Sequence, residues 1–160
     1  MKVTMAFAVG TLVLLAACDQ AGGEPTPVVA DQADERAQLE ANKQLVLDMW
    51  HEVLNGQNFA AARKYISPDY IQHSPGIEGG LEGLIEYLET SRPDAEPLEP
   101  GTYPLTEFEF VLAEGDLVQL MHQRQLPSRD DPDTLVPVWW YDTYRIEDGM
   151  IVEHWDSIHR

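Results

Sequence analysis

Hydrophobic positions recur at helical spacing in the first half of the chain. Between residues 35 and 54 the apolar side chains fall three or four residues apart, which predicts an amphipathic helix that ends at Asn55-Gly56. We expect a short helix over residues 59–66, closed by a Ser-Pro pair, and a third over residues 81–88. The apolar residues of the first helix are Leu39, Leu45, Val46, Met49, Trp50, Val53 and Leu54.

From residue 106 the apolar period changes to two, which is the period of a strand with one buried face. Strands are predicted over residues 106–112, 117–125, 135–146 and 150–157, separated by turns that contain Gly or by a polar loop. Helices followed by an antiparallel meander define an α+β fold without parallel strand–helix–strand units. Three N-terminal helices are therefore expected to pack on an antiparallel sheet.

The N-terminal segment has the layout of a secretory signal, since Lys2 precedes an apolar run with no charged residue before Cys18. Leu-Ala-Ala-Cys at residues 15–18 resembles the bacterial lipobox, so residues 1–17 are predicted to be a signal peptide and Cys18 the lipidation site. An ordinary cleaved signal with an incidental cysteine is the alternative. Residues 18–34 are rich in Gly, Pro and acids and predict a flexible tether before a domain at 35–160.

Composition narrows the class of protein. A chain of 160 residues is one ordinary domain, and 28 acidic against 10 basic side chains give a net charge of −18. Such a charge repels phosphate backbones, so we expect no nucleic-acid partner. Histidines and Asp142 could supply metal ligands, but the sequence holds no close-spaced ligand pair, and we predict neither a metal nor a cofactor.

The register of the last predicted hairpin decides which side chains share a face, because a one-residue slip reverses every side chain. A two-residue loop would set Asp142 opposite Trp155. A three-residue loop, with Gly149 in the left-handed conformation, would set Asp142 opposite His154 instead. We expect the second register. It places six residues on one face of the hairpin: Trp140, Asp142, Tyr144, Val152, His154 and Asp156.

This face combines two carboxylates and an imidazole with Trp and Tyr rings. Burying such groups is costly unless they are paired, and burial raises the pKa of a carboxyl group toward neutrality. That environment suits a general base. The alternatives are a hydrogen-bonded Asp-His pair in an inert pocket, or the same residues on a solvated face.

Three segments resemble the SnoaL-like polyketide cyclase family, within the nuclear-transport-factor-2-like (NTF2-like) superfamily. They are Tyr65 to Tyr70 (YISPDY), Gly79 to Leu88, and the closing run Tyr144 to Asp156 (YRIEDGMIVEHWD). The resemblance spans residues 35–158, and the closing run is its most specific part. It implies a cone of three helices against a strongly curved antiparallel sheet that encloses one pocket.

The resemblance also implies a chemistry. Enzymes of the family close polyketide rings by aldol condensation without a cofactor, using an Asp near the end of the last strand to remove a proton next to a carbonyl. The matching residue is Asp156. Where the cyclase pattern has a pocket His, this sequence has Asp142. An Asp at this position is similar to ketosteroid isomerase, a member of the same superfamily that uses a protonated Asp as a donor.

The expected catalytic residues are Asp156 as the base, His154 to orient it, and Asp142. We expect substrate-binding residues in the pocket wall at His73, His122, Trp140 and Tyr144. Asp142, His73 or His122 would supply the proton donor to the developing oxyanion. These groups suit an intramolecular lyase or isomerase acting on a small carbonyl-containing or aromatic substrate.

A non-catalytic module that holds a small apolar ligand in the same pocket is the second hypothesis, because a fold does not decide function. A homodimer is expected, since Tyr141, Ile151 and Trp155 fall on the face opposite the predicted site. Lipid on Cys18 would anchor the protein in the bacterial cell envelope on the periplasmic side. By resemblance to enterobacterial lipoproteins, Asp19 favours the inner membrane, a rule that varies among bacteria.

Overall fold

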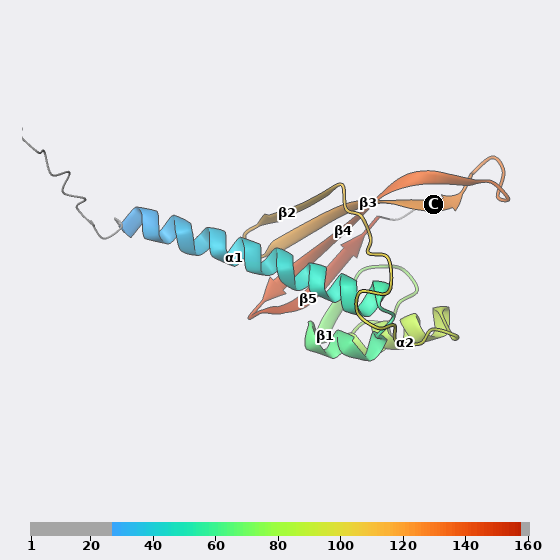
Figure 1. Cartoon of the computed structure of the whole chain (residues 1–160), viewed down its shortest axis with the longest axis horizontal. Helices are drawn as coiled ribbons and strands as arrows, with labels where there is room; N and C mark the ends of the chain where they lie inside the picture. Colours follow the sequence, from blue (N-terminus) through green and yellow to red (C-terminus); the bar gives the residue numbers. More distant parts are fainter. Residues whose placement is uncertain (1–26, 158–160) are drawn as a thin grey trace, which may run out of the picture.

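The computed structural model describes residues 27–157 and contains four helical segments and five strands. The helical segments are α1 (Pro27–Met49), the π-helix η1 (Trp50–Asn55), the 3-10 helix η2 (Phe59–Lys64) and α2 (Leu81–Ser91). The strands are β1 (Ile66–Gln72), β2 (Phe110–Glu114), β3 (Leu117–Pro127), β4 (Leu135–Glu147) and β5 (Met150–Asp156). This is the predicted α+β architecture (Figure 1). Strand β1 lies between η2 and α2 in the chain, and the other four strands of the curved sheet follow the helices.

The sheet has the order β1-β5-β4-β3-β2, and β1 pairs with β5 in parallel. The prediction of a short helix that Ser67-Pro68 closes is wrong in one respect, because both residues lie inside a strand, β1. Proline cannot donate to a ladder, but an edge strand tolerates it, and Ile66 and Tyr70 are buried on either side of it. The parallel pairing brings the end of β1 beside the end of β5.

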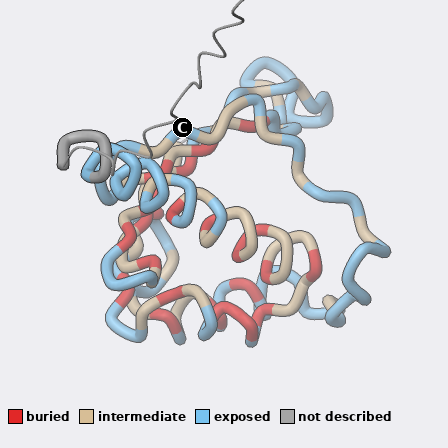
Figure 2. Tube along the Cα trace, turned by 60° about the vertical axis from the view of Figure 1, so that its left-hand side comes forward, coloured by how far each residue is buried: buried red, intermediate tan, exposed pale blue. Residues whose placement is uncertain are grey.

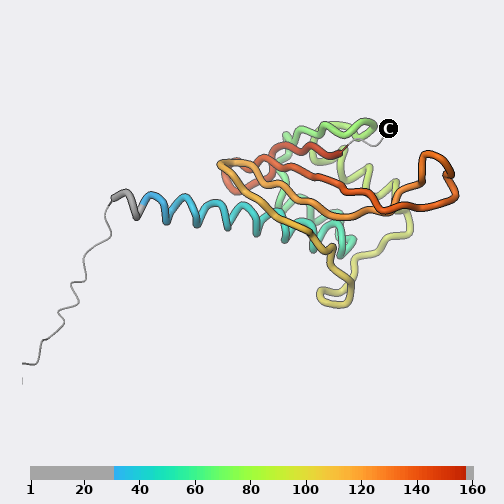
Figure 3. The backbone as a smooth tube through the Cα atoms, turned by 90° about the horizontal axis from the view of Figure 1, so that it is seen from above, coloured from blue at the N-terminus to red at the C-terminus, as the bar shows by residue number. Residues whose placement is uncertain are grey.

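α1 is longer than predicted. It begins at Pro27, so the last eight residues of the predicted tether at 18–34 are helical, and the remainder lies outside the described residues. Proline suits the first turn of a helix. Residues 31–38 are exposed, so this part of the helix needs no apolar face and gives no apolar period in the sequence. This part of α1 projects beyond the sheet (Figures 1 and 3). Among the described residues, no helix combines the length and apolar character of a membrane span.

The β4–β5 hairpin adopts neither of the two predicted registers. Asp148 and Gly149 both have positive φ, 49° and 74°, and form a two-residue turn that pairs Glu147 with Met150. The pairing then skips Val152, which is a β-bulge. As a result Asp142 lies opposite Asp156, and Tyr144 lies opposite His154.

The two-residue turn also changes the place of Ile151, which was predicted on the face away from the site. Ile151 is fully buried and pairs with Ile146, so it belongs to the core. We call the sheet face that the helices cover the inner face, and the opposite one the outer face. The buried residues in Figure 2 lie along the segments where the helices meet this inner face, and the core includes Val53, Val118 and Leu120.

Candidate active site

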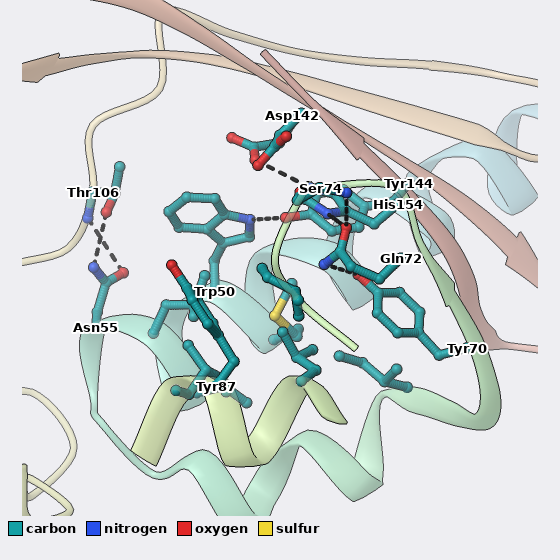
Figure 4. Close-up of a pocket in the computed structure, with 18 of the residues that line it drawn as sticks. Trp50, Asn55, Tyr70, Gln72, Ser74, Tyr87, Thr106, Asp142, Tyr144 and His154 are labelled. Carbon is teal, nitrogen blue, oxygen red and sulfur yellow. Dashed lines mark hydrogen bonds and ion pairs between the residues drawn. The ribbon is translucent and has the colours of Figure 1, made fainter. Parts of the chain in front are cut away.

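A cavity of about 370 Å³ lies between the helices and the inner face of the sheet. Helical residues such as Val53, Leu84 and Leu88 give it an apolar wall. Polar side chains from β1, β3, β4 and β5 form another wall, part of which Figure 4 shows. A cavity of this size with a few convergent polar groups is typical of small-molecule sites.

Asp142 on β4 is 5 % exposed and contacts an imidazole from each neighbouring strand. Its Oδ1 lies 3.1 Å from Nε2 of His154 on β5, and its Oδ2 lies 3.2 Å from Nε2 of His122 on β3. Burial alone would raise the pKa of Asp142, but the hydrogen bonds from His122 and His154 bring it below its ordinary value. Asp142 is therefore a carboxylate that accepts two hydrogen bonds, which does not fit the predicted role of proton donor.

The amide of Gln72 holds the ring of His154 through a hydrogen bond with Nδ1. The backbone N–H of Ser74 donates to Oε1 of Gln72 at 3.0 Å and so identifies the oxygen end of the amide. Nδ1 of His154 lies 3.1 Å from the same oxygen and must donate to it. Nε2 of this ring faces a carboxylate oxygen of Asp142 at 3.1 Å. Both nitrogens of His154 are therefore engaged within the protein.

His122 keeps one nitrogen for a ligand. Its Nε2 contacts Asp142, whereas Nδ1 has no hydrogen-bond partner among residues 31–157. Trp50 and Phe108 meet the imidazole edge-on, with centroids 5.1 and 5.8 Å away, and hold its orientation. Since His122 lines the cavity, Nδ1 can exchange a proton with a bound molecule.

Asp156 is half-buried, lines the same cavity and lies opposite Asp142 in the ladder. Within the described part of the chain its carboxylate has no hydrogen-bond donor. Burial, and then the nearby charge of Asp156, raises the pKa of Tyr70, so this phenol stays protonated beside it. A carboxylate without a partner at a cavity wall can accept a proton from a bound molecule.

Tyr144 also lines the cavity and joins the helices to the site. Nε1 of Trp50 donates to its hydroxyl oxygen at 2.9 Å, and its ring stacks on His154 with centroids 4.5 Å apart. Burial raises the pKa of Tyr144 well above its ordinary value. The phenol therefore stays neutral and helps to fix the ring of His154.

Two of the predicted pocket residues lie elsewhere. His73 is on the outer side, where Nε2 lies 2.7 Å from Glu153 and the ring stacks on Trp155. Strand alternation explains this, because Gln72 occupies the inward position at the end of β1. Trp140 is half-buried and packs beneath Arg124, outside the cavity lining.

Tyr70, Gln72 and Ser74 line the cavity but were not predicted as site residues. Tyr70 and Gln72 belong to β1, and Ser74 follows two residues after its end. The missing signal was β1 itself, since Pro68 hides its strand pattern. Trp50 was assigned to the helix core, and nothing in a helical period shows that its indole N–H reaches Tyr144.

The histidines and Asp142 are not arranged as metal ligands. His122 and His154 both direct Nε2 at the oxygens of Asp142, and His73 lies on the other side of the sheet. In the part of the chain that the structure describes, no group of three His, Cys, Asp or Glu residues is placed to hold a metal ion.

Helices that cover one face of a curved sheet and enclose a polar-walled cavity define an NTF2-like α+β domain with a small-molecule pocket. The chain belongs to the SnoaL-like domain family, whose model matches residues 47–154. No curated protein matches the sequence.

Solved structures share the fold at low sequence identity. A candidate SnoaL-like polyketide cyclase from Jannaschia sp. is 20% identical with a TM-score of 0.54, covering 85% of this chain and 90% of its own. A candidate polyketide cyclase from Acidithiobacillus ferrooxidans is 21% identical with a TM-score of 0.53, covering 73% and 87%. AclR, a candidate hydroxylase from Streptomyces galilaeus, is 24% identical with a TM-score of 0.53, covering 76% of each chain.

Replacing Asp142 with Asn should destabilise the protein by about 3 kcal/mol at pH 7, because it removes the charge that two buried imidazoles face. The pKa of Asp142 is lower folded than unfolded, so its stabilisation is present above about pH 4 and is lost as pH falls through the folded value. The difference between wild type and variant should therefore shrink below about pH 4.

Urea denaturation of both proteins from pH 7 down to pH 3 measures this difference. Asp133→Asn, in the exposed β3–β4 loop, is the matched control and should stay near wild type. A wild-type-like Asp142→Asn protein at pH 7, or a difference that is independent of pH, would contradict the assignment.

Proposed function

We propose that this protein is a cofactor-independent enzyme that removes a proton next to a carbonyl group, for an aldol-type cyclisation or an isomerisation of a small carbonyl-containing or aromatic substrate. The observation that carries the proposal is one cavity wall on which, within residues 31–157, Asp156 has no hydrogen-bond partner and Nδ1 of His122 is free. A free base and a positioned imidazole are the two groups that such a reaction needs. Membership of the SnoaL-like family supports the same chemistry.

In this mechanism Asp156 takes the proton from the carbon, and the bond electrons move to the carbonyl oxygen to form an enolate. His122 takes part with a proton on each ring nitrogen: its Nδ1–H donates to that oxygen while its Nε2–H remains on Asp142, and both protons stay on the ring. Asp142 and His154 are positioning residues, because their polar atoms are engaged with each other, with His122 and with Gln72. The proton on Asp156 returns to the product, so the enzyme ends as it began.

A binding module that holds a small apolar ligand is the second candidate. The apolar wall from Val53, Leu84 and Leu88 favours it, as does the complete pairing of Asp142 inside the protein. The candidate hydroxylase AclR has a similar fold, and one fold hosts many functions. Exchange of a ligand's α-proton with solvent distinguishes an enzyme from such a module.

Asp156→Asn should lower the rate of catalysed α-proton exchange by about 100- to 10,000-fold, because the amide cannot accept a proton. The rate is measured by proton NMR in D₂O with a panel of simple aryl ketones, with enzyme-free exchange subtracted. Asp133→Asn is the control of equal charge change in an exposed loop. Exchange by a folded Asp156→Asn protein at the wild-type rate would refute the base and favour the binding module.

We also propose a homodimer through the outer face of the sheet. Trp139 and Tyr141 are 49% and 41% exposed there, and Leu112 is 56% exposed. Phe110 packs beside Tyr141 with ring centroids 6.4 Å apart, so the apolar area is continuous across β2, β3 and β4. An apolar area of this kind is typical of an interface.

Tyr141→Glu should convert the dimer to a monomer at micromolar concentration, because it places a charge in the middle of that area. Light scattering of the protein measures the mass. Leu98→Glu, at an exposed loop position away from the sheet, should leave the dimer intact. A monomeric wild type would exclude the interface.

Attachment to the envelope through lipid on Cys18 is part of the proposed function, supported by the lipobox-like residues 15–18. Cys18 lies outside the described residues. Cys18→Ser should move the protein from the membrane fraction to the soluble fraction of bacterial cells, because several acyl chains give stable anchoring. Mass spectrometry of the mature N-terminus checks the modification, and a variant that remains anchored would refute it.

A further inference from the structure

The basic side chains of the described region differ in their partners. In this acidic protein four of them lie within 4.0 Å of a carboxylate: Lys43, Arg63, Lys64 and Arg145. Arg92 and Arg124 have no such partner among residues 31–157, and both line the cavity. Arg36 and Arg129 also form no ion pair there, but they do not line it.

Each cavity guanidinium is held by contacts that leave most of its N–H groups free. Arg124 lies over the ring of Trp140, with Cζ 4.4 Å from the centroid. Arg92 lies 5.4 Å over the ring of Phe59, and its Nη1 donates to the carbonyl oxygen of Leu54 at 3.3 Å. A guanidinium has five N–H donors in a planar fork that matches an anionic oxygen group. Both side chains are therefore oriented and able to bind such a group.

The two arginines lie toward the same end of the cavity. Arg92 donates to the carbonyl oxygen of Leu54, and the next residue is Asn55. Nδ2 of Asn55 donates to Oγ1 of Thr106 at 2.8 Å. Thr106 and Arg124 both line the cavity and the groove that adjoins it. Figure 4 shows Asn55 and Thr106 on one side of the cavity, and His154 on another.

We propose that the substrate carries an anionic oxygen group, such as a carboxylate, which Arg92 and Arg124 bind while the reacting carbon lies toward Asp156. This substrate class deepens the function proposed above and rests on it for the role of Asp156. A protein of net charge −18 repels anions over most of its surface. Arg92 and Arg124 both line one cavity and have no carboxylate partner in the described part of the chain, so this cavity is a favourable place for an anion.

Ser74 supplies an independent sign that the ligand is polar. This residue is 9% exposed and lines the cavity, yet its Oγ has no hydrogen-bond partner in the described structure. Leaving a buried hydroxyl unpaired is costly, so such a group calls for a partner. A ligand oxygen or N–H in the cavity would satisfy it.

Two fluorescent dyes with the same aromatic skeleton test the proposal: 1-anilinonaphthalene-8-sulfonate, which is an anion, and neutral N-phenyl-1-naphthylamine. The full chain should bind the sulfonate at least tenfold more tightly, despite its own negative charge. Arg92→Gln and Arg124→Gln should each weaken sulfonate binding by about fivefold and leave the neutral dye unchanged. Arg129→Gln, outside the cavity, is the matched control and should change neither.

NMR places the dye on the protein. Trp50 lines the cavity and its indole N–H donates to Tyr144, whereas Trp139 and Trp155 belong to the outer side, so the ¹⁵N–¹H signals of these three of the four tryptophans distinguish the two locations. A shift of the Trp50 signal with the same affinity as the fluorescence change supports the proposal. A shift confined to Trp139 and Trp155 overturns it.

Equal or weaker binding of the sulfonate overturns the proposal, as does a preference that survives in the Arg92→Gln/Arg124→Gln double variant. Failure to bind either dye also counts against it. Dye binding requires no turnover, so the outcome is separate from that of Asp156→Asn. If Asp156→Asn keeps full exchange activity while the arginine variants lose the sulfonate, the catalytic role fails and the anion site stands.

Discussion

The carboxylate of Asp142, shared between two imidazoles, is the interaction on which the site depends. It joins β3, β4 and β5 at one point of the inner face, where His122 and His154 approach from either side. Burying that charge is favourable only because both oxygens are occupied, and the lowered pKa of Asp142 reflects this balance. With both oxygens of Asp142 occupied, Nδ1 of His122 and the carboxylate of Asp156 are polar groups of this wall that have no hydrogen-bond partner within residues 31–157.

Curvature and charge divide the molecule into two environments. The inner face encloses a cavity that combines apolar helical residues with the polar groups of four strands, and it contains two of the unpaired arginines. The outer face carries an apolar area around Tyr141 and an ion-pair group in which Arg145 contacts Glu153 and Asp116. Because successive side chains of a strand point to opposite faces, Gln72 lies at the cavity and contacts His154, whereas His73 lies on the outer side and contacts Glu153.

Family membership narrows the chemistry but does not specify the substrate. SnoaL-like domains and their structural neighbours have the same helices on a curved sheet, and the neighbours include both candidate cyclases and a candidate hydroxylase. Discrimination among such reactions comes from the side chains at the cavity, because the fold supplies only the enclosure. Here the distinguishing features are Asp142 bridged by two histidines, the unpartnered Oγ of Ser74, and the two arginines.

The sequence by itself determined the α+β class and most helix and strand positions, because these follow from local periodicity, which depends only on neighbouring residues. Asp142, Tyr144, His154 and Asp156 were expected on one face from a hairpin register that the protein does not adopt, and a two-residue turn with a bulge brings them to one wall instead. Three features required the tertiary structure: the parallel edge strand β1, the bulge at Val152, and the hydrogen bond between His154 and Gln72. Pro68 obscures the first, and the other two depend on contacts between strands. Such contacts form only when the whole sheet has assembled, because register and hydrogen-bond partners are properties of pairs of strands.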